Sequence, residues 1–355
     1  MGRLDPELRA VLRMGIFEVW RLGVPAPVAT DSMIRLTRRL GKTSAAGMVN
    51  AVMRRAAAAD DGNDASPDLT WSHPEWLWCR WSDVFGAAPA EGAMAAAQEP
   101  APPWVWFSSD DAKADVVETG AILERHPWCP GTWTATEGRS ELMRAVHRGR
   151  AIVQDPSSQL VARLSVSVVD GGGTAVDLCA APGGKSAMIE RLGRWRLFVV
   201  ADRSPAKVVR LGRRLGDVPV LVTDALRPAL AVGAWDLVLL DAPCSGTGTL
   251  RRHPELKWRL RPEAIVEAAA NQRPMIEAAL ELLAPGGVLV YATCSVESEE
   301  NEGHFDTVPA GYETVVMDEL LPADLPWTET SAGGVRILPH EHGDGFTVHA
   351  LRREN

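Results

Sequence analysis

The N-terminal part of the chain contains two stretches with different patterns of apolar and polar positions. In residues 1–59, apolar side chains recur near a 3.6-residue period, most clearly at 8–20, which predicts helices. The segment 24–27 carries two prolines and interrupts this pattern, so we expect a second helix to follow Asp31, a residue type favoured at helix N-termini. Residues 60–68, rich in Asp, Gly and Pro, then predict a linker.

Residues 70–148 show no single period and predict a small α+β domain. The stretch is rich in tryptophan, and exposed indole rings could stack on nucleic-acid bases. The favoured interpretation is that the indoles fill a small mixed core, because each buries a large apolar area. The residues concerned are Trp71, Trp76, Trp78, Trp81, Trp104, Trp106, Trp128 and Trp133.

From about residue 170 onward, short apolar segments alternate regularly with helical ones. Nearly continuous apolar segments of this length indicate strands buried on both faces. Strands that are separated by helices indicate a parallel, doubly wound α/β sheet. The predicted strands are 174–179, 197–201, 218–222, 235–240 and 288–292, and the predicted helices include 186–192, 205–215 and 262–283.

An unusual concentration of acids and thiols lies where these strands end. Ligands of open α/β sheets bind beyond the carboxyl ends of the strands, so these positions should carry the chemistry. The candidate residues are Cys179, Ala180, Ala181, Pro182, Gly183, Gly184, Lys185, Asp202, Asp224, Asp241, Cys244 and Cys294.

The loop after the first strand favours a nucleoside ligand with a small anionic tail. Residues 182–184 allow close backbone approach and open a helix, whose N-terminus attracts negative groups. They match neither the G-x-G-x-x-G fingerprint nor the P-loop. Asp202 suits ribose hydroxyls, and Asp224 could hydrogen-bond an adenine amino group. S-adenosylmethionine has this shape, with its carboxylate near Lys185. The alternative is a structural turn with capping aspartates.

Two of the strand-end residues, Cys244 and Cys294, are thiols on candidate neighbouring strands. A buried structural cysteine would more often lie in the middle of a strand. A thiolate that adds to C6 of cytosine makes C5 able to attack a methyl sulfonium, which is covalent catalysis. Asp241 could hold the N3/N4 edge of the pyrimidine. The pattern therefore favours methyl transfer to a cytosine over two structural thiols.

The composition is that of a globular protein of 355 residues, with 46% hydrophobic and 23% charged residues. Its five cysteines are widely spread and form no C-x-x-C pair, so we expect neither a disulfide framework nor a metal site. No apolar run is long enough to span a bilayer, and the first residues lack an apolar signal core. We therefore expect a cytoplasmic location and no membrane partner.

The net charge of −9 does not exclude a nucleic-acid partner, because the acidic residues are concentrated in one segment. Residues 295–345 hold twelve Asp or Glu and one Arg, which leaves +2 on the rest of the chain. Local basic surfaces decide phosphate binding more than net charge does. We expect an RNA backbone to be guided by Arg251, Arg252, Lys257 and Arg259, the alternative being a solvated helix face.

Four long motifs, in family order, resemble the Nop/Sun family of RNA cytosine-5 methyltransferases. They are DLCAAPGGKS at 177–186, LDAPCSGTG at 240–248, RRHPELKW at 251–258 and YATCS at 291–295. The resemblance covers the chain from about residue 70 to its end. It implies a Rossmann-like methyltransferase domain that uses S-adenosylmethionine and no metal.

The resemblance also implies a role for each candidate residue. Cys294 matches the nucleophile of the family, and Cys244 matches the thiol that assists product release. Cys179 corresponds to a backbone contact of the cofactor rather than to a third catalytic thiol. The remaining matches are to the S-adenosylmethionine-binding positions, which are residues 179–185, Asp202, Asp224 and Asp241.

Residues 1–59 resemble the later half of a NusB-like RNA-binding helical domain. By the same resemblance, 70–148 form a small RRM-like α+β subdomain and 149–355 the methyltransferase domain. This arrangement favours family members that act on 16S ribosomal RNA, either free or within an assembling small subunit, and we expect a monomer. Transfer RNA is an alternative substrate. A non-catalytic RNA-binding or assembly factor is a further alternative, which the intact Cys244, Cys294 and Asp241 oppose.

Overall fold

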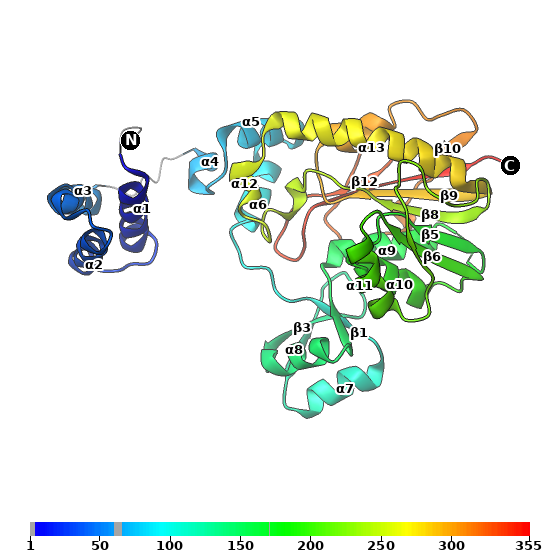
Figure 1. Cartoon of the computed structure of the whole chain (residues 1–355), viewed down its shortest axis with the longest axis horizontal. Coiled ribbons are helices and arrows are strands. Elements are labelled where there is room, and N and C mark those ends of the chain that lie inside the picture. Colours follow the sequence, from blue (N-terminus) through cyan, green and yellow to red (C-terminus); the bar gives the residue numbers. More distant parts are fainter. Residues whose placement is uncertain (1–3, 60–65, 170) are drawn as a thin grey trace. The chain divides into compact units, whose positions relative to one another are not determined.

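The computed structural model describes residues 4–59, 66–169 and 171–355, which divide into two compact units (Figure 1). The first unit is Met1–Ser66 and the second is Pro67–Asn355. Most of the predicted linker, residues 60–65, lies outside the described residues. Each unit has its own hydrophobic core.

The first unit consists of helices around a small apolar core. Its elements are α1 (Pro6–Trp20), α2 (Ala26–Arg39), the 3-10 turn η1 (Thr43–Ala45) and α3 (Ala46–Ala58). The prediction that α2 follows Asp31 is wrong, because the helix begins at Ala26. Pro27 lies in its first turn, where no backbone N–H is needed. Asp31 instead forms an i,i+4 ion pair with Arg35 at 2.7 Å. The core side chains are Leu8, Val11, Leu12, Ala29, Met33, Val49 and Met53.

The second unit begins with three helices and a small sheet. The helices are α4 (Pro67–Thr70), α5 (Glu75–Phe85) and α6 (Ala87–Ala96), and Trp81 of α5 packs with Leu250 and Val296. The sheet is antiparallel with the order β2-β3-β1-β4. Its elements are β1 (Val105–Phe107), α7 (Asp110–Glu118), β2 (Ile122–Arg125), β3 (Thr132–Glu137), α8 (Arg139–His147) and β4 (Ala151–Val153).

The tryptophans of this region are core residues, as the favoured interpretation held. None of the eight is exposed, and Trp81, Trp104, Trp106 and Trp128 are each less than a tenth exposed. The division between 70–148 and 149–355 stays a proposal. In the structure β4, which follows residue 148, pairs with β1 in the small sheet.

A nine-stranded sheet forms the centre of the second unit, in the order β11-β12-β13-β9-β8-β5-β6-β7, with β10 paired to β13. The five predicted strands are present and parallel to one another, as expected. They are β5 (Thr174–Asp177), β6 (Leu197–Asp202), β7 (Val220–Val222), β8 (Trp235–Asp241) and β9 (Leu283–Thr293). An antiparallel extension completes the sheet with β10 (Tyr312–Thr314), β11 (Thr328–Glu329), β12 (Val335–Ile337) and β13 (Phe346–Arg353).

Helices cover both faces of the parallel strands, which confirms the doubly wound α/β prediction (Figure 1). One face carries α9 (Pro156–Ser167), α10 (Gly184–Leu192) and α11 (Pro205–Leu215), and the other carries α13 (Pro262–Leu282). Between these elements lie α12 (Leu256–Arg259) and the 3-10 turns η2 (Thr247–Thr249), η3 (Ser298–Glu300), η4 (Glu302–His304) and η5 (Asp318–Leu320). Among the described residues, no helix combines the length and the apolar character needed to cross a bilayer.

Candidate active site

A cavity of about 290 Å³ lies at the carboxyl ends of the parallel strands. The chain reaches it by five separate loops, one after each strand, because parallel strands all end at the same edge of a sheet. The structure thus brings together residues as far apart in the sequence as Leu178 and Cys294. The predicted site residues that line the cavity are Cys179, Ala181, Lys185, Asp202, Asp224, Asp241, Cys244 and Cys294.

The loop after β5 depends on glycine for its conformation. Gly183 has φ +97°, and a Cβ at this position would lie 2.8 Å from Leu211 Cδ2. The helix α10 begins directly afterwards, at Gly184. The other end of the loop is fixed by Ala180, whose N–H donates to the Ala201 carbonyl at 2.9 Å. The loop therefore presents its backbone at the start of a helix, where negative groups are favoured.

Asp202 and Asp224 take part both in local turns and in the cavity wall. The Oδ1 atom of Asp202 accepts a hydrogen bond from the Ser204 amide at 2.9 Å. In the same way, Oδ1 of Asp224 accepts from the Leu226 amide at 3.0 Å. Both interpretations of these acids, capping and ligand binding, are thus compatible with the structure. In each acid the hydrogen bond to Oδ1 fixes the orientation of the carboxylate, and both residues line the cavity.

Lys185 and Asp241 form an ion pair inside the cavity, with Nζ 2.7 Å from Oδ2. Burial disfavours the charged form of Lys185, but the Asp241 carboxylate outweighs this and the pKa of Lys185 is raised. We expected Lys185 near the cofactor's carboxylate, whereas its ammonium contacts Asp241. The ammonium also lies 4.8 Å from the centre of the Phe346 ring. The site therefore contains a fixed positive charge.

The two thiols lie side by side, with 3.3 Å between the Sγ atoms of Cys244 and Cys294. Their strands β8 and β9 are parallel neighbours, with Asp241 opposite Ala292, so the cysteines begin adjacent loops. The hydrogen bond with Cys294, and burial, raise the pKa of Cys244 well above its ordinary value. Ionisation of Cys244 is therefore disfavoured.

Cys179 is the third thiol at the cavity. Burial raises its pKa strongly, and the nearby carboxylates of Asp177, Asp241 and Asp202 raise it further. A thiol in this environment is a poor nucleophile, because the reactive form is the thiolate. The remaining cysteines are Cys79, which is exposed, and Cys129, which is buried.

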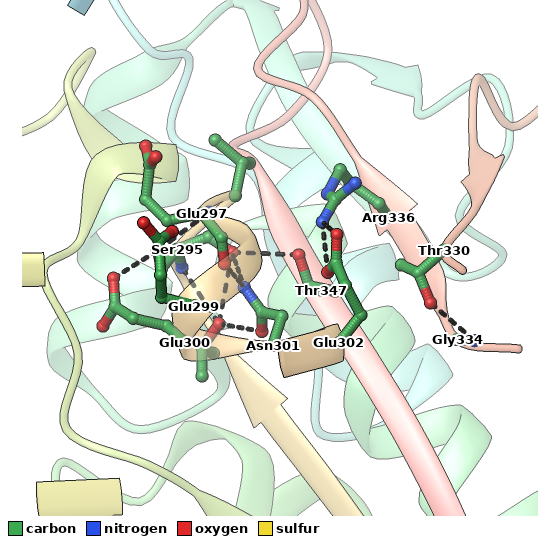
Figure 2. A network of polar contacts seen from close by, with 12 residues as sticks. Ser295, Glu297, Glu299, Glu300, Asn301, Glu302, Thr330, Gly334, Arg336 and Thr347 are labelled. Carbon is green, nitrogen blue, oxygen red and sulfur yellow. Dashed lines mark hydrogen bonds and ion pairs between the residues drawn. The ribbon is translucent and has the colours of Figure 1, made fainter. Parts of the chain in front are cut away.

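Buried polar side chains that sequence reasoning missed support the loop of Cys294 (Figure 2). Asn301 Oδ1 accepts a hydrogen bond from Thr293 Oγ1 at 2.7 Å, and its Nδ2 donates to the Ser295 carbonyl at 3.1 Å. That carbonyl also accepts from Thr347 Oγ1 at 2.9 Å. In the sequence, the acids after Ser295 indicate only a concentration of charge. However, four of them are buried: Glu297, Glu300, Glu302 and Asp344.

The expected RNA-guiding cluster is largely used for structure instead. Arg251 donates to the His340 and Glu341 carbonyls, and Arg252 pairs with Asp155 at 2.7 Å and Asp344 at 2.8 Å. Lys257 is buried, and burial lowers its pKa to about 8. The prediction is therefore wrong for these three residues. Of the four, Arg259 is exposed.

A different surface offers positive charge next to the cofactor loop. A cleft of about 730 Å³ runs between α8, β4 and α11 and includes Ala181 and Pro182 of that loop. All of its charged or titratable lining residues are basic: His147, Lys207, Arg210, Arg213 and Arg214. Arg210 and Arg213 are exposed. This concentration of positive charge is notable in a protein whose net charge is −9.

Family models match both units of the chain. Residues 169–352 match the model of the 16S rRNA methyltransferases RsmB/F, and residues 1–58 match that of the NusB family. The chain belongs to the RsmB/F family of 16S rRNA methyltransferases. It is thus an S-adenosylmethionine-dependent rRNA methyltransferase with a NusB-type domain at its N-terminus.

Relatives of this methyltransferase align along almost its whole length. The putative methyltransferase Rv1407 of Mycobacterium tuberculosis is 32% identical over 99% of this chain and 81% of its own. The ribosomal RNA small subunit methyltransferase B of Pasteurella multocida is 31% identical, and the alignment covers 98% of this chain and 80% of that protein. The crystal structure of PH0851 superimposes with a TM-score of 0.75 and 26% identity, covering 99% and 83% of the two chains. NSun6 from Pyrococcus horikoshii shares the fold, with a TM-score of 0.66 and 20% identity. The match covers 79% of this chain and 98% of the NSun6 chain.

The cavity suits the cofactor that the family requires. Asp202 and Asp224 line it, and the ammonium of Lys185 balances Asp241, whereas Gly183 and Gly184 do not line it. Carboxylates at these strand ends are appropriate acceptors for a nucleoside's hydroxyl and amino groups. In the described part of the chain, no three His, Cys, Asp or Glu side chains are grouped as a metal site would require.

Proposed function

We propose that this methyltransferase transfers a methyl group to C5 of a cytosine in 16S ribosomal RNA, with Cys294 as covalent nucleophile and Cys244 assisting release. The observation that carries the proposal is the 3.3 Å separation of the two Sγ atoms in a cavity that also holds Asp202 and Asp224. Cytosine C5 is too weakly nucleophilic to be methylated without activation, and a neighbouring thiolate supplies it.

In the proposed reaction the Cys294 sulfur bonds to C6, and the electrons of the C5–C6 double bond move to C5. C5 bonds to the methyl group of S-adenosylmethionine while the bond between that methyl and the sulfonium sulfur breaks and leaves its electron pair on the donor. Solvent water then accepts the C5 proton, the electrons of the C5–H bond restore the C5–C6 double bond, and the C6–S bond breaks with its electron pair returning to the Cys294 sulfur. The ammonium of Lys185 lies in the same cavity, and its interaction with Cys294 contributes to the raised pKa of Lys185. The thiol of Cys244 can donate a hydrogen bond to the departing sulfur.

The proposed substrate and cofactor have further support. Relatives carry the name ribosomal RNA small subunit methyltransferase B, and the all-basic cleft suits a phosphate backbone. The NSun6 structure was determined with SFG, an S-adenosylmethionine analogue. We assign cofactor contacts to residues 179–185, Asp202, Asp224 and Asp241. The monomeric state and the cytoplasmic location stay predictions.

The proposal can be tested by methyl transfer from labelled S-adenosylmethionine to unmodified 16S rRNA, followed by mapping of the modified base. Cys294→Ala should abolish transfer, because the proposed covalent adduct at C6 cannot form without the Cys294 sulfur. Cys244→Ala should accumulate a protein–RNA adduct that survives denaturation. Cys79→Ala, which alters an exposed thiol, should behave like the wild type.

Two results would overturn the mechanism: full activity of Cys294→Ala, or a methyl group on an atom other than C5. Transfer RNA belongs in the same assay as a competing substrate. If it is methylated faster than 16S rRNA, the proposed substrate is wrong although the chemistry stands.

A further inference from the structure

The loops that carry the two catalytic cysteines meet at one buried carboxylate. Each cysteine is followed by a serine, and both serines donate hydrogen bonds to Glu300. Figure 2 labels Ser295 and Glu300 of this group. The Ser245 N–H donates to Oε2 at 2.8 Å, while its hydroxyl donates to Oε1. The Ser295 hydroxyl donates to the same Oε1 at 2.6 Å. Glu300 therefore joins two segments that are about fifty residues apart in the sequence.

Glu300 also forms hydrogen bonds with residues outside the two cysteine loops. Its side chain is fully buried, and Gln272 Nε2 donates to Oε2 at 3.0 Å. The same Gln272 amide donates to the Pro243 carbonyl at 2.9 Å, directly before Cys244. The Tyr291 hydroxyl donates to the Glu300 carbonyl at 2.7 Å. A buried group with this many partners is rigid, and so are the loops attached to it.

We propose that Glu300 is a positioning residue that holds the Cys244 thiol within reach of the Cys294 sulfur. This inference rests on the proposed function, in which Cys244 assists release of the product. Glu300 acts through the serines that follow the cysteines. It would set the 3.3 Å separation of the two sulfurs before RNA binds, so that release needs no rearrangement of the loops.

A carboxylate suits this position because it can accept all four hydrogen bonds, two from N–H groups of Ser245 and Gln272 and two from the serine hydroxyls. An ionised carboxylate offers about four lone-pair positions and no hydrogen, which matches the donors of Ser245, Ser295 and Gln272. In Glu300→Gln the negative charge is lost, and the new NH₂ group either faces the N–H donors at Oε2 or requires both serine hydroxyls at Oε1 to turn and accept from it. The substitution preserves the shape but weakens the connection between the loops, because hydrogen bonds to an ionised group are roughly twice as strong as those between neutral groups.

Glu299 provides a matched control on the same 3-10 turn, η3. Its side chain is 41% exposed and pairs with Arg80 instead of the serine residues of the catalytic loops. Glu299→Gln removes the same charge from the same turn without altering the contacts of Ser245 and Ser295. Any effect of Glu300→Gln that Glu299→Gln reproduces would be due to charge alone.

The first experiment measures the position of the sulfurs directly, without RNA. A diazene oxidant such as diamide converts two adjacent thiols into a disulfide, taking up two electrons and two protons. The Cys244–Cys294 disulfide is identified by peptide mass mapping. We expect Glu300→Gln to form it more slowly than the wild type by on the order of tenfold to a hundredfold, whereas Glu299→Gln reacts like the wild type.

The second experiment measures release during turnover. Glu300→Gln should accumulate part of the denaturation-resistant RNA adduct that Cys244→Ala accumulates fully, with unchanged affinity for S-adenosylmethionine. A merely structural role would lower the melting temperature and all activities together, without an adduct. If Glu300→Gln is not folded, the double variant Ser245→Ala/Ser295→Ala removes the two hydroxyl contacts and should give the same two results.

The outcomes separate this inference from the proposed function. Wild-type rates of disulfide formation in Glu300→Gln, or in the double serine variant, would overturn the positioning role. Absence of an adduct in Cys244→Ala would instead overturn the release role of Cys244 and, with it, the purpose assigned to Glu300. The disulfide rates would still show what sets the sulfur separation.

Discussion

Burial decides the protonation of single residues beneath the cofactor loop. Asp177, at the end of β5, is almost fully buried, and its Oδ2 accepts a hydrogen bond from Ser186 Oγ at 2.6 Å. Its other oxygen has no hydrogen-bond partner among the described residues. Burial therefore raises the pKa of Asp177 to about 7. A carboxyl group that is partly protonated near neutral pH makes the stability of the fold depend on pH.

Asp177→Asn should remove part of this pH dependence. Between the ordinary value of 3.8 and about 7, folded Asp177 binds a proton that the unfolded chain releases. Its contribution to stability is thus present at acid pH and lost as the pH rises through about 7. As the pH rises through this window, the free energy of unfolding of the variant should increase relative to that of the wild type by up to ~1.4 kcal/mol per pH unit. Urea unfolding from pH 5 to pH 8 measures the difference.

The exposed Asp217 supplies the control for this prediction. The free energy of unfolding of Asp217→Asn should change with pH in the same way as that of the wild type. If the Asp177→Asn curve is parallel as well, the acid is not protonated in the folded protein.

At the scale of secondary structure elements, the site depends on close packing between the loops after β8 and β9. Gly248, in the turn η2, donates its N–H to the Cys294 carbonyl at 2.9 Å and accepts from the Gly345 amide at 2.8 Å. A Cβ at Gly248 would lie 2.2 Å from the Gly345 carbonyl oxygen and 2.9 Å from that of Cys294. Backbone atoms on both sides leave no room for any side chain here.

Gly248→Ala should therefore destabilise the protein by about 1–3 kcal/mol and displace the Cys294 loop. Urea unfolding and the methyl-transfer rate measure the two effects. Gly92→Ala is the control, because Gly92 lies within helix α6 with no atom near its Cβ position. It should stabilise the protein by up to about 1 kcal/mol. Equal stability of the two variants would show that the loop adjusts to the added methyl group.

At the scale of the whole molecule, the distribution of charge matters more than the net charge. Several of the acids between Ser295 and Gly345 are buried or paired with arginine, as in the pairs of Glu302 with Arg336 and of Asp344 with Arg252. Meanwhile the cleft beside the cofactor loop is lined by basic side chains of α8 and α11. An RNA backbone can thus bind a protein of net charge −9.

Reversing two charges in this cleft should weaken RNA binding. Arg210→Glu/Arg213→Glu should lower the affinity for 16S rRNA. The slope of log K against log salt should fall by about 1 for each RNA phosphate that the cleft no longer neutralises. Fluorescence anisotropy at several salt concentrations measures both quantities. Binding of S-adenosylmethionine should be unchanged.

The matched control for this pair lies at the opposite edge of the sheet. Arg194 and Arg196 are exposed and precede β6, at the amino ends of the parallel strands. Arg194→Glu/Arg196→Glu makes the same change in net charge. An equal loss of affinity in both double variants would indicate attraction by overall charge and contradict a binding role of the cleft.

Local patterns predicted most of the parallel sheet and the chemistry at its edge. The five apolar segments became β5 to β9, since strands buried on both faces need apolar residues throughout. Because parallel strands end at one edge, the acids and thiols that follow them were expected together, and they line one cavity. The start of α2 was missed, because two prolines that interrupt the apolar pattern are also compatible with the first turn of a helix.

The partners of charged residues could not be predicted, since they come from distant parts of the chain. The sequence by itself determined the doubly wound fold and the candidate thiols, because periodicity and strand ends are local properties. The tertiary structure alone decided that Arg251 and Arg252 hold loops rather than RNA, and that Glu300 is a buried acceptor rather than a surface charge. The physical reason is that burial and hydrogen-bond partners depend on which segments the fold brings together, and a charged side chain has the same sequence signature in either environment.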